Sequence, residues 1–258
     1  MASTIKVNTL DTQSGTEMAL AATKKITGDN TQFKITGGAN TNVLTTDGAG
    51  VLTWGAIAAG FAGIHTDVSG GSEVYTVPTG VTNLLVFITG GGGGGGTGVL
   101  AASNGTGGGA AGTVIANVTV VAADTITIAI GAGGASGTVG GDSSFTHSTG
   151  TGSFDAITAP GGRPGATAST VSSPTAPTVG SSNDGIAIKG GWPMNWLTSA
   201  GLGAASFWGG GGQGGYLNTT TAVAADAFGA GGGGGGYWAG ALSGGAGAVG
   251  VCFIMEFK

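Results

Sequence analysis

Two unbroken runs of glycine, residues 90–96 and 231–236, constrain the fold of this chain more than any other feature. Glycine makes up 60 of the 258 residues, and it loses more backbone freedom on folding than any other residue. Such a composition often indicates disorder. However, 40 % of the residues are hydrophobic and only 7 % are charged, whereas disordered glycine-rich tracts are mostly polar or charged. We therefore expect the glycine region to be folded.

Strand patterns adjoin the glycine blocks. Residues 84–88 are continuously apolar and stand directly before the first block, which predicts a strand buried on both faces. Residues 113–121 and 125–130 alternate between apolar and polar side chains, and we expect residues 122–124 to form a hairpin turn between them. Residues 143–159 lie between glycine blocks, and we expect them to form a loop. The chain closes with the apolar run 251–257. Together these patterns predict an all-β fold, a glycine-rich β-sandwich of jelly-roll type.

The glycine blocks themselves predict an unusual kind of packing. Consecutive glycines can form an extended threefold helix that rises about 3.1 Å per residue, and neighbouring helices can approach closely because glycine has no Cβ. Their backbone N–H and C=O groups must be paired if they are buried. We therefore expect packed polyglycine II-type helices, in which an all-glycine run accepts neighbours on every face and a mixed run accepts fewer. The blocks are bounded by Gly90 and Gly96, Gly131 and Gly134, Gly209 and Gly212, and Gly231 and Gly236.

The chain divides into three expected parts. Residues 1–30 have no sustained hydrophobic period, so we expect them to be ordered by docking onto another surface. Residues 31–63 contain short strand patterns, and Asp47-Gly48 predicts a tight hairpin. Strands this short predict an intertwined neck of several chains. Residues 64–258 are expected to form the distal domain.

The charge pattern excludes several classes of partner. The net charge is −5, and no Lys or Arg lies between Lys34 and Arg163. Nucleic-acid binding requires clustered cations, so we expect no nucleic-acid partner. The apolar runs are shorter than the roughly 20 residues of a membrane-spanning helix, and the N-terminus has no signal-peptide core. We expect no membrane insertion, synthesis in a cytoplasm, and no export by the usual route.

Motifs for chemistry are weak. Residues 245–250 match G-x-G-x-x-G, but a strand pattern follows where a dinucleotide site needs a helix. His65 and His147 have no second His or Cys nearby in the sequence for a zinc site, and His147 is expected to be solvated. No nucleophile-elbow motif is present. The sequence therefore predicts no catalytic residues, no metal, no cofactor and no enzymatic activity.

Aromatic residues near the glycine blocks are the best candidates for a binding site, because Trp and Tyr dominate recognition surfaces. They could instead cap the glycine bundle. We favour capping for Phe207, Trp208, Tyr237 and Trp238, and leave both interpretations open for the WPMNW segment. The candidate binding residues are Trp192, Pro193, Asn195, Trp196, Tyr216 and Asn218.

Several segments resemble those of tailed-phage fibre proteins. TVPTGVTNLLVFITGGGGGGG, ITIAIGAGGASGTVGGDSSF, GGGGGGYWAG and GAVGVCFIMEF are similar to their glycine-rich C-terminal domains. MASTIKVNTLDTQSGTEM and ITGGANTNVLTTDGAGVLTWG resemble their attachment and shaft segments. The resemblance implies a homotrimeric receptor-binding protein located in the virion. Its N-terminus would join other tail or capsid proteins, and its C-terminal loops would bind a host surface glycan or outer-membrane protein.

Three other functions compete with host attachment. The first is a purely structural virion component, such as a capsid decoration fibre or whisker. The second is an ice-binding protein, which would need regularly spaced Thr or Ala on a flat face, whereas the loops here are irregular. The third is a depolymerase, which would need a pair of catalytic carboxylates, and the sequence shows no such pair.

Overall fold

The structure is a computed structural model that describes residues 42–46, 52–56, 60–99, 103–167, 183–196, 199–215, 221–237 and 242–258. The chain forms two compact units, Met1–Ile57 and Ala58–Lys258. The sequence placed this boundary after residue 63. Strand β3 (Phe61–Asp67) pairs with the last strand, β13 (Val251–Phe257), so residues 61–63 belong to the second unit.

The first unit contains the predicted hairpin. Strand β1 (Asn42–Thr46) pairs with β2 (Leu52–Ala56) in antiparallel register, and Thr46 lies opposite Leu52. The hairpin turn at residues 47–51 and the expected docking segment, residues 1–30, lie outside the described residues. Winding of several chains into a neck stays a prediction.

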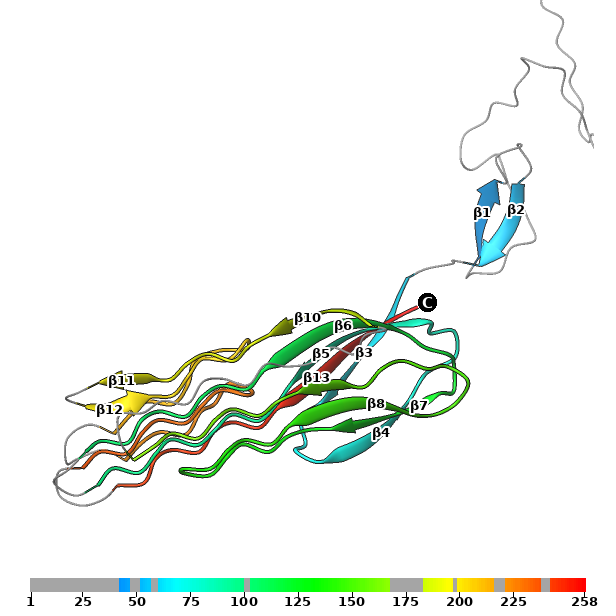
Figure 1. Cartoon of the computed structure of the whole chain (residues 1–258). Coiled ribbons are helices and arrows are strands. Elements are labelled where there is room, and N and C mark those ends of the chain that lie inside the picture. The colour runs from blue at the N-terminus through cyan, green and yellow to red at the C-terminus, as the bar shows by residue number, and fades with distance from the viewer. Residues whose placement is uncertain are drawn as a thin grey trace, which may run out of the picture. The chain divides into compact units, whose positions relative to one another are not determined.

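The second unit is all-β, as predicted, and no helix occurs in its described residues. A five-stranded antiparallel sheet has the order β10-β6-β5-β13-β3, and a four-stranded antiparallel sheet has the order β4-β7-β8-β9 (Figure 1). The remaining strands of these sheets are β4 (Ser72–Thr76), β5 (Asn83–Thr89), β6 (Thr113–Thr119), β7 (Thr125–Ala129), β8 (Ser143–Thr149), β9 (Ile157–Ala159) and β10 (Asp184–Ile188).

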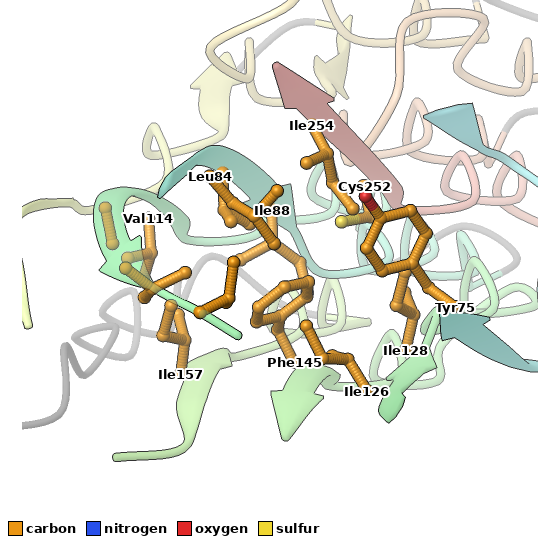
Figure 2. Packing of buried hydrophobic residues seen from close by; sticks show 14 of the residues in the cluster. Tyr75, Leu84, Ile88, Val114, Ile126, Ile128, Phe145, Ile157, Cys252 and Ile254 are labelled. Carbon is orange, nitrogen blue, oxygen red and sulfur yellow. The ribbon is translucent and has the colours of Figure 1, made fainter. Parts of the chain in front are cut away.

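The two sheets face each other across a hydrophobic core (Figure 2). Alternate residues of each strand point inward, as the period-two pattern requires. Leu84 and Ile88 of β5 meet Ile126 of β7 and Phe145 of β8, and all four side chains are fully buried. Burial of large apolar side chains contributes about 1.5–3 kcal/mol each, so this core stabilises the sandwich.

Three local predictions were wrong. Residues 122–124 do not close a hairpin, because β6 and β7 belong to different sheets and the turn crosses between them. Residues 143–159, expected as a loop, contain β8 and β9. Strand β5 is buried on one face only, because Leu85 and Phe87 are partly exposed.

The glycine blocks continue the strands of both sheets (Figure 1). Residues 90–96 follow β5, residues 131–134 follow β7, and residues 160–165 follow β9. Residues 105–112 lead into β6, and residues 244–250 lead into β13. We call this continuation the glycine bundle. The sandwich and the bundle are therefore one structure. The same chain segments form β-ladders in the sandwich and then, in the bundle, form backbone hydrogen bonds of another pattern.

The pairing within the bundle has a period of three residues. The N–H groups of Gly91 and Gly94 donate to residues 138–141, those of Gly92 and Gly95 to residues 245–248, and those of Gly93 and Gly96 to residues 106–109. The carbonyls follow the same period: they accept from segments 162–165, 134–137 and 232–235. Residues 91–96 are thus hydrogen-bonded to six neighbouring segments. This is the period that polyglycine II packing requires, and the helical conformation itself stays a prediction.

The second long run is surrounded in the same way. Residues 231–236 bond to segments 93–96, 105–108, 201–204, 212–215 and 242–245, and to Val223. Thus the two longest runs of glycine both have backbone neighbours on all sides. A Cβ added to any of residues 91–96 would lie closer than 3.0 Å to backbone atoms of a neighbour. The bundle therefore requires glycine at these positions for steric reasons.

A single methyl group tests this requirement. In Gly94→Ala the new Cβ meets the backbone of Ala135. We expect a loss of stability of about 3 kcal/mol, the upper part of the range for overpacking, because a clash with backbone cannot be relieved by a rotamer change. Gly210→Ala is the matched control, since no atom lies within 4 Å of its Cβ position. Thermal unfolding measures both, and equal melting temperatures would contradict the packing described.

Candidate binding site on the glycine bundle

A small hairpin is attached to the bundle toward the end that lies away from the sandwich (Figure 1). Strand β11 (Met194–Trp196) pairs with β12 (Ser199–Leu202) in antiparallel register. The backbone of Gly201 and Ala204 is hydrogen-bonded to the glycine segments 105–108 and 231–234. The hairpin thus has a base whose backbone polar groups are fixed by pairing.

A groove lies beside this hairpin and has a volume of about 660 Å³. Three large apolar side chains at the groove are open to solvent: Trp192 (57 % exposed), Met194 (53 %) and Leu202 (37 %). The groove is also lined by Gln213 and by glycine and alanine residues. Large apolar side chains beside a few polar groups are typical of ligand sites.

The groove is electrically neutral. Residues 190–225, which include every residue that lines it, contain no Asp, Glu, Lys or Arg. It therefore offers stacking on the indole ring, apolar contact, and hydrogen bonds from an amide side chain and the backbone. A neutral saccharide or an uncharged protein loop has matching chemistry, whereas an anionic ligand would find no charged partner there.

The structure places the predicted binding residues differently from one another. Trp192 lines the groove and is exposed, whereas Pro193 is buried and has a packing role. Asn195 and Trp196 lie in β11, and the positions of their side chains are outside the description, as are Tyr216 and Asn218. Sequence reasoning missed Leu202 and Gln213, because a groove formed between segments leaves no local pattern.

Capping was expected for Phe207 and Trp208, and of these two only Trp208 contacts the junction of bundle and sheet, since Phe207 is 47 % exposed. The Trp208 indole N–H donates a hydrogen bond of 2.8 Å to the Thr89 hydroxyl. The Trp208 ring meets Phe207 and Phe228 edge to face, with ring centroids 5.1 and 6.5 Å apart. The Trp208 ring covers the point where β5 becomes a glycine segment. Trp238 lies outside the described residues.

His147 was expected to be solvated, and this expectation was wrong. Its side chain is 16 % exposed, lies in β8, and contacts the Phe154 ring edge to face. Its Nε2 atom lies 3.6 Å from the Asp124 carboxylate. The backbone N–H groups of Val121, Thr151 and Gly152 donate to the same carboxylate. The arrangement holds the crossover turn between the sheets, and no nucleophile takes part in it.

The Asp124 carboxylate predicts an acid-sensitive turn. Burial alone would raise its pKa, but the hydrogen bonds from Val121, Gly152 and Thr151 and the neighbouring His147 hold the pKa of this carboxyl below its usual value. A carboxyl whose pKa is depressed on folding stabilises the fold above its unfolded pKa, and this stabilisation is lost as pH falls through the folded pKa.

We therefore expect stability to fall as the pH drops below about 4, and Asp124→Asn to reduce this dependence while lowering stability at neutral pH. Asp226→Asn, at an exposed position, is the control. Chemical denaturation from pH 2 to 7 measures both variants. If the free energy of unfolding of Asp124→Asn fell below pH 4 as steeply as that of the unchanged protein, this role would be contradicted.

Across the described segments, no three His, Cys, Asp or Glu side chains are grouped so that they could hold a metal ion. The same segments contain no helix long and apolar enough to cross a membrane.

The fold and the groove define a glycine-rich all-β protein with a neutral surface site. The sequence profile of the glycine-rich domain family matches residues 66–255. This match spans most of the chain, so the protein belongs to the glycine-rich domain family. No curated protein matches the chain.

Proposed function

We propose that this protein is a fibre or spike of a bacteriophage virion that attaches to the host cell surface. The observation that carries the proposal is the groove: an exposed indole and a thioether in a neutral hollow, mounted on a bundle of paired backbone. An exposed aromatic on a rigid base is the usual form of a recognition hot spot. The resemblance to phage fibre segments supports the virion location.

The placement of the groove supports this proposal. The second unit begins beside its own C-terminus, because Gly60 and Lys258 exchange backbone hydrogen bonds. These residues lie at the sandwich end, whereas β11 and β12 lie toward the far end of the bundle (Figure 1). If the N-terminal segment joins other tail or capsid proteins, the second unit is held by one end and offers the groove near the other.

The proposed partners follow from these features. The receptor would be a host surface glycan or an outer-membrane protein, bound without enzymatic turnover or a cofactor. Assembly as a homotrimer would give three grooves per trimer, and multivalency would convert weak single contacts into strong attachment. Neither nucleic acid nor membrane insertion enters the proposal.

Binding of the labelled full-length protein to intact host cells tests the proposal. We expect saturable binding that competes with phage adsorption. Trp192→Ala should weaken it about 10- to 30-fold, because losing an aromatic hot spot costs about 2 kcal/mol. Phe207→Ala is the matched control, since Phe207 is also exposed (47 %) and does not line the groove. Equal binding by both variants would place recognition elsewhere.

The same assay distinguishes the alternatives. Periodate treatment of the cells should abolish binding if the receptor is a glycan, and protease treatment should abolish it if the receptor is a protein. Absence of binding by the folded protein would favour the alternative function, a structural virion component such as a decoration fibre or whisker.

A further inference from the structure

The outer face of the five-stranded sheet is apolar, although it points away from the core. Residues alternate along each strand, so those between the core residues share the opposite face. On β5, Leu84 and Ile88 are buried in the core, while Leu85 and Phe87 lie on the other side and are partly exposed. We call this surface the outer face. Its exposed or partly exposed apolar residues are Phe61, Ile64, Leu85, Phe87, Ile115, Ile186, Ile188, Phe253, Met255 and Phe257.

The strand register joins these residues into continuous rows. Ile186, Ile115, Phe87 and Phe253 are successive partners across β10, β6, β5 and β13. Leu85, Met255 and Ile64 are successive partners in an adjacent row. The Phe87 and Phe253 rings contact each other edge to face, with centroids 5.9 Å apart. The apolar residues therefore form one patch rather than isolated exposed side chains.

The edges of this patch are strongly exposed. Ile186 on one edge strand is 63 % exposed, and Phe61 and Ile64 on the other are 57 % and 56 % exposed. Five strands about 4.8 Å apart and seven residues of about 3.3 Å each give a face of roughly 500 Å² in projection. This face, polar residues included, is as large as the largest surface patches of typical monomers, which are about 300–600 Å² and often functional. It amounts to more than half of the roughly 800 Å² that each partner contributes to a stable interface.

The patch has little charge. Among the outward residues of the five strands, only Asp184 is charged, and it lies on the edge strand β10. The other polar outward residues are Asn and Thr, such as Asn83, Asn117 and Thr66. The net charge of −5 therefore lies almost wholly elsewhere on the chain. Asp184 is exposed at the end of the edge strand, so two such faces can meet with this charge at the solvated rim and without burying an unpaired charge in the centre.

We propose that the outer face is the interface between copies of this chain. A flat apolar sheet face packs well against another sheet at about 10 Å. Each copy carries the same neutral surface at the same concentration, so a further copy matches it in chemistry and size. The inference does not depend on receptor binding at the groove, because the groove and the outer face share no residue.

Site-specific photo-crosslinking of the purified full-length protein tests this proposal. The photoreactive residue p-benzoylphenylalanine replaces Ile186 in one variant and Val74 in another. Val74 is equally exposed (63 %) but lies on β4 of the opposite sheet. We expect irradiation to give covalent chain-to-chain products at position 186 and few at position 74. Only intrachain products at 186, no products, or equal yields at both positions would overturn the proposal.

A second pair of variants measures the strength of the contact. Ile64→Lys combined with Ile186→Lys places two charges on the outer face at exposed positions that the core does not need. Charges in an apolar interface are costly to bury, so we expect the crosslinking yield at a Phe61 probe to fall at least 10-fold. Val74→Lys is the control. An unchanged yield in the double variant would exclude the outer face as the interface.

Discussion

Backbone hydrogen bonding without side chains is the interaction on which the second unit depends. In a sheet, each strand pairs with two neighbours, and its side chains occupy the other two directions. Past Thr89 the same chain pairs with six segments, because the positions that side chains would occupy are filled by backbone. The cost is the large loss of glycine backbone entropy, and it is offset by complete pairing and dense packing.

This constraint explains the order of residues along the chain. The all-glycine runs 91–96 and 231–236 have neighbours on every side, whereas residues 244–250 include Ala246 and Val249, which are partly exposed. The base of the groove is formed by segments that are hydrogen-bonded to this bundle. Because Gly201 and Ala204 are held by the bundle, the hairpin that precedes the groove has little freedom to relax. A site of this kind can be neutral and shallow and still present its aromatic in a fixed position.

The sequence predicted the parts that depend on local patterns. The strands at residues 84–88, 113–121, 125–130 and 251–257, and the pairing of β1 with β2, follow from periodicity and turn residues. Prediction from the sequence failed where contacts between distant segments determine the structure. The residues of β8 are rich in Ser and Thr, which is typical of a loop, but their pairing with β7 makes them a strand. The apolar run of β5 implied two buried faces, and the second sheet covers only one. In the groove, Trp192 was found from its type, while Gln213 is brought there by the bundle.

Amide hydrogen exchange of the full-length protein, resolved to residues 91–96 and 231–236, tests the central claim most directly. A paired bundle predicts slow exchange, with protection similar to that of the core strands β5 and β13, because the N–H groups of residues 91–96 and 231–235 donate to backbone carbonyls of neighbouring segments. Exchange of these amides at the rate of an unstructured chain, while β5 and β13 stay protected, would contradict the account. The glycine runs would then be loops attached to a sandwich, and the groove would have no rigid base.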